Sequence, residues 1–153
     1  MLIDYINPFV ESAFEIMSEI LNTSISRQQL QLKQLGDGMK GFTVIIGVTG
    51  AVYGRIVFDM TEETALALAG KLNDEHFIEV NDLVRGTISE IGNMVTARAV
   101  TKLSKESKFF NFSPPTLIVG DHITIFESDS TEALIIPIDT SLGIIDINIA
   151  LKN

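Results

Sequence analysis

The sequence predicts an α+β fold: an antiparallel sheet with helices packed on one face. Three segments have the apolar spacing of amphipathic helices, at about residues 7–22, 61–72 and 81–105. Shorter apolar or alternating segments, separated by turn residues, follow one another directly before the second helix and after the third. Because strands joined by short turns run antiparallel, we expect one helix, three strands, two helices and four strands, in that order.

The helix boundaries follow from capping residues. The first helix is expected to begin at Asn7-Pro8, because asparagine caps helices and proline is tolerated at the first helical position. It ends near Asn22. The second begins after Thr61, which can cap it and is followed by two glutamates that favour the helix dipole. The third and longest helix is expected from Asn81 to Lys105.

The strands are bounded by glycine, proline and polar residues. The segment 27–35 alternates polar and apolar residues and predicts a half-buried strand, followed by a turn at residues 36–38. Segments 42–48 and 51–60 predict a β-hairpin with its turn at Thr49-Gly50. After the third helix, four strands are expected, at residues 116–120, 122–128, 132–139 and 143–152.

Length and charge limit the classes of function. The 153 residues fit a single domain over residues 1–153, long enough to bury about 68–70% of the surface of the unfolded chain. Apolar residues make up 46% and charged residues 20%, which is typical of a globular core. The net charge of −9 argues against binding to nucleic acid or to an anionic membrane.

The sequence also predicts a cytoplasmic protein. It contains no cysteine, which excludes disulfides, thiolate metal sites and cysteine nucleophiles and suits a reducing compartment. The amino terminus carries Asp4 and Glu11 where a signal peptide would have basic residues and an apolar run. No apolar run approaches the roughly 18 residues that a membrane span needs, so no membrane insertion is expected.

Other candidate sites have simpler structural explanations. Residues 36–41 match G-x-G-x-x-G, but a strand follows them where the dinucleotide fingerprint requires a helix. His76 and His122 stand alone, without acidic or histidine residues at the spacing of metal ligands. Several aspartates fall at strand ends or turns, where they commonly bond to the backbone: Asp37, Asp59, Asp74, Asp121 and Asp139. We therefore predict no cofactor and no metal site within the chain itself.

The long helix has two distinct faces. At about 100° per residue, its β-branched and small apolar residues gather on one side, which we assign to the core: Val84, Ile88, Ile91, Val95 and Ala99. Small and polar residues gather roughly opposite: Gly86, Glu90, Asn93, Ala97 and Ser104. Gly86 and Gly92 each cost the helix about 1 kcal/mol relative to alanine, so some other interaction should offset that cost.

Glu90 and Asn93 are three residues apart and therefore lie side by side on the outer face. Small residues one turn before and after them would let another backbone approach closely. The spacing Glu-x-x-Asn alone is weak evidence, because it arises by chance and recurs at Glu19 and Asn22. At the end of the first helix, Asn22 is more simply explained as a helix terminator, although a second site there stays open.

The residues around this pair carry a resemblance. The segment SEIGNMVTARAV (89–100), with SPPTLIVG (113–120) after it, resembles the CheC/CheX/FliY family of chemotaxis phosphatases, and its CheX branch most closely. The resemblance covers most of the chain and implies the CheX/CheC-like fold. In that family Glu-x-x-Asn on a long exposed helix is the catalytic signature, which here corresponds to Glu90 and Asn93. The family usually has Asp or Ser at the position of Gly86, so an accessory polar contact is missing or comes from Thr87 or Ser89.

The resemblance implies a phosphatase acting on the aspartyl phosphate of a CheY-like response regulator. Asn93 would orient the attacking water, and Glu90 would pair with a lysine of the regulator, which also supplies Mg²⁺. The resemblance further implies a homodimer, and the apolar closing segment 144–151 could offer a strand edge for pairing. The alternatives are a non-catalytic module that binds a response regulator or flagellar-switch component on the same fold, and an enzyme for an unrelated small ligand.

Overall fold

The computed structural model describes residues 3–22, 25–27, 31–34, 38–105, 109–125 and 132–152. The described chain forms three helices: α1 (Ile3–Leu21), α2 (Glu62–Asn73) and α3 (Asp82–Ser104). It also forms eight strands: β1 (Ser26–Arg27), β2 (Gln31–Gln34), β3 (Phe42–Gly50), β4 (Tyr53–Met60), β5 (Phe110–Phe112), β6 (Thr116–Val119), β7 (Glu132–Thr140) and β8 (Gly143–Lys152). The predicted α+β class is confirmed.

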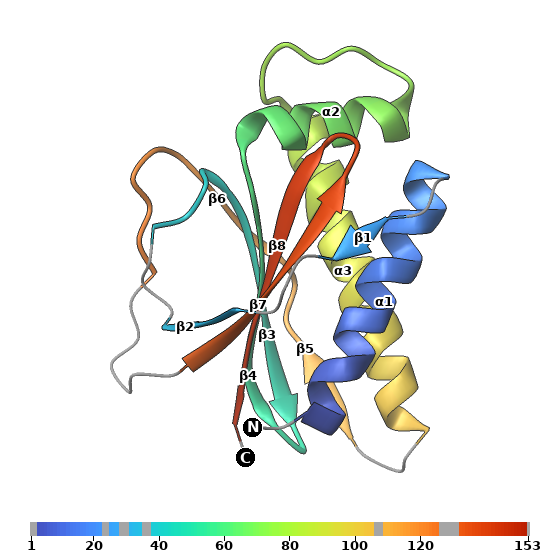
Figure 1. The fold of residues 1–153 in the computed structure, drawn as a ribbon, viewed down its shortest axis with the longest axis vertical. Coiled ribbons are helices and arrows are strands. Elements are labelled where there is room, and N and C mark those ends of the chain that lie inside the picture. Colours follow the sequence, from blue (N-terminus) through green and yellow to red (C-terminus); the bar gives the residue numbers. More distant parts are fainter. Residues whose placement is uncertain are drawn as a thin grey trace.

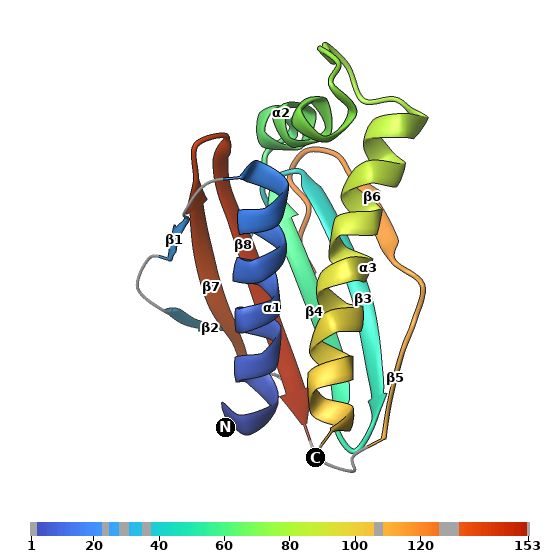
Figure 2. The same ribbon diagram turned by 90° about the vertical axis from the view of Figure 1, so that its right-hand side faces the viewer.

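All strand pairs of the sheet are antiparallel, in the order β1-β7-β8-β4-β3-β5. The short strands share the two edges, because β2 also pairs with β7 and β6 also pairs with β3. Figures 1 and 2 show α1 and α3 side by side on one face of this sheet, with α2 across one end. The helices therefore cover one face, as the sequence predicts.

The core lies between the sheet and the two long helices. The helices contribute Phe9 and Ile16 from α1 and Ile88 from α3, each at most 1% exposed. The inward residues of the central strands are buried to the same degree: Phe42, Val44, Ile46, Ile56, Ile136, Ile138, Ile147 and Ile149. Alternation along these strands places one row of side chains under the helices. This burial holds α3 in a fixed position on the sheet.

Helix α1 begins earlier than predicted. It starts at Ile3, so Pro8 lies inside the helix and not at its first position. The additional turn buries Ile6 and brings Tyr5 against Phe110, with the ring centroids 6.0 Å apart in an edge-on arrangement. Proline in the interior costs a helix a hydrogen bond, and burial of apolar side chains in the added turn offsets that loss. The predicted start at Asn7 is therefore wrong.

The other helix boundaries are confirmed. The Thr61 side chain accepts a hydrogen bond from the backbone N–H of Thr64 at 3.2 Å and caps α2. The Asn81 side chain accepts from the backbone N–H of Val84 at 2.9 Å and caps α3. Both caps satisfy backbone N–H groups that have no partner inside the helix.

The strands before α2 agree with the predicted ones in part. The predicted strand 27–35 is represented by two short strands, β1 and β2, whose pairing registers on β7 differ by one residue. The hairpin of β3 and β4 is present, but its loop is Ala51-Val52 and not Thr49-Gly50. Gly50 stays in β3 because it pairs with Phe110, at a φ of 121° that favours glycine. The predicted turn at 36–38 lies largely outside the described residues.

Two strand predictions after α3 need correction. Residues 110–112 form β5, a strand of only three residues that was not predicted. Residues 122–125 of the predicted strand 122–128 are not in a strand, and 126–128 lie outside the described residues. Strand β8 pairs with β7 on one side and β4 on the other, so the closing segment offers no free edge. That argument for dimerisation is wrong.

Candidate active site on helix α3

Helix α3 presents the two faces that the sequence predicts. The assigned core residues are at most 6% exposed: Val84, Ile88, Ile91, Val95 and Ala99. Glu90 and Gly86 are exposed, and Asn93 is half-buried. Apart from its chain neighbours and the backbone of the same helix, a Cβ atom built on Gly86 would have no atom within 4 Å. The face that carries Glu90 and Asn93 is thus bordered by open space on the side of Gly86.

Gly92 sets how closely α3 approaches the sheet. A Cβ atom at this position would lie 3.2 Å and 3.3 Å from two ring carbons of Phe58 and 3.3 Å from a methyl of Val44. Glycine therefore lets the helix backbone rest directly on β3 and β4. The buried Thr96 hydroxyl donates to the Gly92 carbonyl at 2.9 Å. Close packing on the sheet is what offsets the low helix propensity of Gly92.

The packing role of Gly92 was not predicted, because glycine was considered only for its low helix propensity. The signal was present in the spacing. Gly92 lies four residues after Ile88 and three before Val95, both of which belong to the core face. Because Asn93 is the next residue, the contact at Gly92 also fixes how far the Asn93 backbone stands from the sheet.

The described residues give Glu90 and Asn93 no hydrogen-bond or ion-pair partner. One polar neighbour of the pair, Thr87, is engaged elsewhere. Thr87 accepts a hydrogen bond at 2.9 Å from the Asn73 side chain, which also donates to the Ala69 carbonyl at 2.8 Å. This contact ties the end of α2 to α3 one turn before Glu90. The carboxylate and the carboxamide are therefore available to a partner molecule.

A shallow groove of about 370 Å³ opens beside Glu90. Its lining residues come from α2, α3 and the end of α1. Figure 2 shows these parts of the three helices at one end of the molecule. Its lining is mainly apolar: Ile20, Leu72, Asp82, Leu83, Gly86, Thr87, Glu90, Ile91 and Met94. The exposed catalytic candidate Glu90 thus stands at the border of an apolar surface.

The second Glu-x-x-Asn segment is in a different environment. The Glu19 carboxylate binds Arg98 of α3 through two contacts, at 2.8 Å and 3.1 Å. Asn22 follows the last residue of α1 with a φ of 51°, the left-handed conformation typical of a helix end. Glu19 is therefore engaged, and Asn22 fits the interpretation as a helix terminator.

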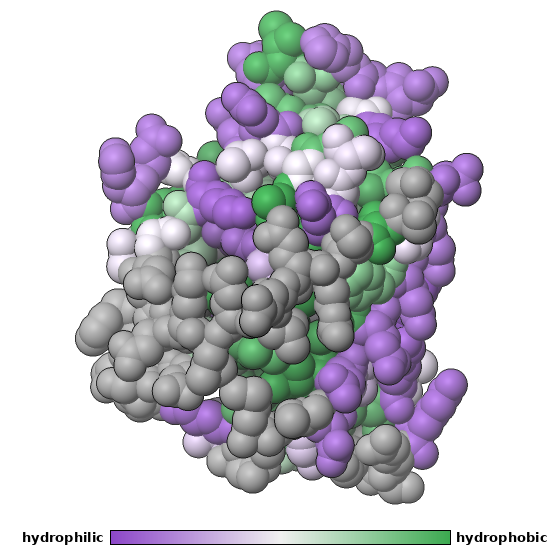
Figure 3. All heavy atoms as spheres, in the orientation of Figure 1, coloured by the Kyte–Doolittle hydropathy of each residue, from purple (hydrophilic) through white to green (hydrophobic). Residues whose placement is uncertain are grey.

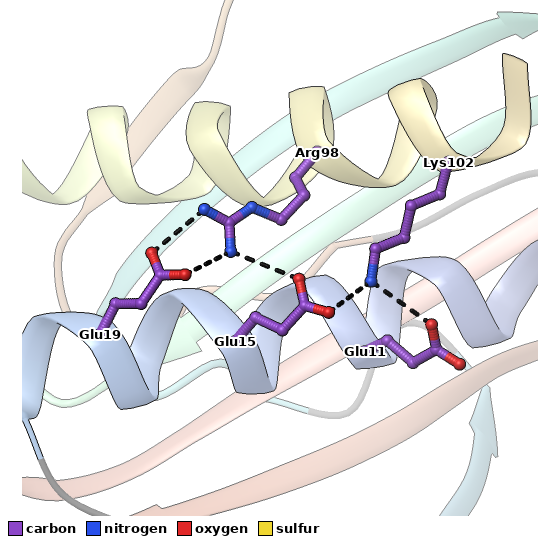
Figure 4. Close-up of polar contacts among 5 residues, drawn as sticks. All are labelled: Glu11, Glu15, Glu19, Arg98 and Lys102. Carbon is purple, nitrogen blue, oxygen red and sulfur yellow. Dashed lines mark hydrogen bonds and ion pairs between the residues drawn. The ribbon is translucent and has the colours of Figure 1, made fainter. Parts of the chain in front are cut away.

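The Glu19 contact belongs to a row of ion pairs that joins α1 to α3 (Figure 4). Arg98 also contacts Glu15 at 3.3 Å, and Lys102 contacts Glu15 at 2.7 Å and Glu11 at 3.4 Å. Hydrophilic residues accordingly cover the outer side of the long helices, along the right-hand border of Figure 3. The hydrogen bond from Lys102 lowers the pKa of Glu15, and that from Arg98 lowers the pKa of Glu19. Because these groups are exposed, each pair contributes little to stability.

The remaining candidates lie apart from α3. His76 and His122 are exposed, and the described residues contain no group of three or more His, Cys, Asp or Glu side chains that could hold a metal ion. Gly41, the last glycine of G-x-G-x-x-G, leads into strand β3 and not into a helix. Among the described helices, none is long and apolar enough to cross a membrane.

Asp59 has a structural role. It is 4% exposed and accepts hydrogen bonds from the backbone N–H of Lys40 at 3.0 Å and from the Thr43 hydroxyl at 2.9 Å. Lys40 also pairs with Asp146 at 3.1 Å. Burial raises the pKa of the Asp59 carboxyl, partly opposed by the hydrogen bond from Lys40. These contacts support the interpretation of Asp59 as a residue that satisfies backbone groups.

Comparison with known proteins decides the family. A sequence model described as "Chemotaxis phosphatase CheX" matches residues 42–139, well over half of the chain. The chain belongs to the CheX family of chemotaxis phosphatases. It is therefore a phosphatase of that family, as the sequence resemblance implies. The match includes the whole of α3 and both candidate residues.

Curated and solved relatives agree with this family. The chain is 22% identical over 121 residues, 78% of each chain, to a CheY-P phosphatase CheX of Thermotoga maritima. Its fold matches the CheX of a CheX–CheY–BeF₃–Mg²⁺ complex from Borrelia burgdorferi with a TM-score of 0.85 and 35% identity, covering 97% and 98% of the two chains. A CheC-like protein from Shewanella sp. PV-4 matches with a TM-score of 0.89 and 24% identity over the full length of both.

Proposed function

We propose that this phosphatase removes the phosphoryl group from the aspartyl phosphate of a CheY-like response regulator. The observation that carries the proposal is the pair on α3: Glu90 is exposed and Asn93 is half-buried three residues later, both without a partner among the described residues and with Gly86 open beside them. The CheX–CheY complex of the relative from Borrelia burgdorferi supports a receiver domain as the partner. A protein substrate also agrees with an open helix face as the site.

The proposed reaction is hydrolysis. The oxygen of a water molecule attacks phosphorus, and the bond from phosphorus to the regulator's aspartyl oxygen breaks. The products are inorganic phosphate and a free aspartate carboxylate. Phosphoryl transfer is catalysed mainly by positioning and by stabilisation of charge, so the phosphatase need not supply a nucleophile of its own.

In this proposal Asn93 orients the attacking water. A carboxamide both donates and accepts hydrogen bonds and does not ionise, so it can hold water near a phosphoryl group without charge repulsion. Glu90 pairs with a lysine of the regulator and fixes the register of the complex. Mg²⁺ is held by the regulator, where it neutralises charge on the phosphoryl oxygens.

The test uses response regulators from the same genome, each phosphorylated with a small phosphodonor in Mg²⁺. At least one should lose aspartyl phosphate faster when this protein is added, and EDTA should stop the acceleration because the regulator's metal is removed. Glu90→Ala should both weaken binding and slow the reaction, because the proposed lysine contact holds the complex together. A complete panel with unchanged dephosphorylation rates would refute the proposal.

We also propose that the protein is a cytoplasmic homodimer. Its support is the family resemblance and the partner, since response regulators act inside the cell. The two edges of the sheet are formed by short strands, β1 and β2 on one side and β5 and β6 on the other.

A further inference from the structure

Apolar side chains are concentrated around the groove beside Glu90. In the described part of the chain, seven large apolar residues are exposed, and three of them line this one groove: Leu72 at 41%, Leu83 at 45% and Met94 at 38%. Single exposed apolar residues are common on protein surfaces, but a group of them in a concave surface marks an interaction site.

The charged residues of the groove indicate which kind of surface on a partner it contacts. Its lining contains two acidic residues, Asp82 and Glu90. Asp82 is paired with Arg85 on the same helix, whereas Glu90 has no partner in the described structure. The groove thus offers an apolar surface with one available carboxylate at its border. It fits an occupant whose apolar side chain lies next to a cation.

We propose that the groove binds an apolar side chain of the receiver domain, next to the lysine that pairs with Glu90, and so selects which regulator is dephosphorylated. This inference rests on the proposed function, because Glu90 is common to the catalytic pair and the groove. A receiver seated on Glu90 and Asn93 must also cover the adjoining surface. Leu72, Leu83 and Met94 then act as specificity-determining residues.

The groove is formed before a partner binds. Ile91 on its floor is 6% exposed and belongs to the core, and the hydrogen bond from Asn73 to Thr87 joins its α2 and α3 walls. A preformed surface loses little conformational entropy on binding, which favours discrimination between partners. Differences in affinity between regulators should therefore follow the side chain that enters the groove.

The test is the double variant Leu83→Gln with Met94→Gln. Glutamine is a good helix former, and both positions are exposed, so the helix should be retained. Val119→Thr is the matched control, because Val119 is 44% exposed on β6, away from the groove. Met94→Leu keeps the groove apolar. Affinity is measured by calorimetry with the receiver domain carrying BeF₃⁻ and Mg²⁺, which stand in for the phosphoryl group and its metal.

The double variant should raise both Kd and KM about tenfold, the size expected for loss of central apolar contacts, and leave kcat unchanged. Val119→Thr should keep the wild-type values, and Met94→Leu should bind the regulator more tightly than the double variant. If the double variant binds a regulator as tightly as the wild type does, and the wild type dephosphorylates that regulator, this inference is overturned. The proposed function then stays intact. Loss of self-association in the double variant, with regulator binding unchanged, assigns the groove to a second copy and also overturns it. Failure of the wild type to bind any regulator instead refutes the proposed function.

Discussion

Helix α3 contains one exposed glycine, Gly86, and one buried glycine, Gly92. Substituting each of them gives a quantitative test of how the helix is held on the sheet. Gly86→Ala and Gly92→Ala make the same chemical change in the same helix. Each should gain about 1 kcal/mol of helix propensity, and this gain cancels when the two variants are compared. Any remaining difference in the free energy of unfolding reports what the new methyl group meets.

At Gly86 the methyl meets open space, so Gly86→Ala should stabilise the protein by about 1 kcal/mol. At Gly92 it lies 3.2–3.3 Å from the side chains of Phe58 and Val44, which are 4% and 0% exposed and must shift to admit it. Overpacking of a dense core typically costs about 1–3 kcal/mol. Gly92→Ala should therefore be less stable than Gly86→Ala by that amount.

The assay is chemical or thermal unfolding followed by circular dichroism. For a protein of this size, each kcal/mol shifts Tm by about 2–4 °C, so Tm of Gly92→Ala should lie roughly 2–12 °C below that of Gly86→Ala. Turnover should also fall in Gly92→Ala, because α3 must move away from the sheet and carry Asn93 with it. Equal stabilisation by both substitutions would show that α3 does not rest on β3 and β4 at Gly92, and would refute this reasoning.

Three further outcomes are expected. Gly86→Arg should fold like the wild type and lose regulator binding in calorimetry, because a long side chain fills the docking surface; an unfolded variant would show that Gly86 is buried. At a pH above 4.5, the ordinary pKa of glutamate, the ion pairs of Glu15 and Glu19 should stabilise the protein. This stabilisation is lost as the pH falls through the lowered pKa values of the two carboxyl groups in the folded state. The Tm of the wild type should therefore exceed that of the double variant Arg98→Met/Lys102→Met by less in acid than at neutral pH. A Tm difference that does not change with pH would contradict this. Light scattering at micromolar concentration should report a dimer, whereas a particle of 16.8 kDa alone would count against it.

Much of the fold follows from local signals. Thr61 caps α2 as predicted, and Asn81, where the long helix is expected to begin, caps α3, because a side-chain oxygen there replaces missing backbone partners. The core face of α3 follows from helical periodicity alone. The same periodicity places Glu90 and Gly86 outward, so the candidate site is visible in the sequence once its two faces are separated.

The errors arise where distant contacts override local preference. Pro8 is a good helix start by itself, yet the helix begins more than a turn earlier, at Ile3, where Tyr5 contacts Phe110. Gly50 has the composition of a turn but pairs with Phe110 of β5. The packing role of Gly92 depends on Phe58 and Val44, which come from other segments. No spacing within the helix identifies those partners.

The rate at which a phosphorylated regulator loses its phosphoryl group tests the central claim most directly. It should be measured in Mg²⁺ at saturating phosphatase for the wild type, for Asn93→Ala and for Asn111→Ala, an exposed asparagine on β5 that serves as control. Asn93→Ala should lower the maximal rate by about 10²-fold with little change in affinity, because an interaction made mainly in the transition state is lost. Asn111→Ala should match the wild type. Acceleration that persists undiminished in Asn93→Ala would contradict the account, since the water would then be positioned by another group.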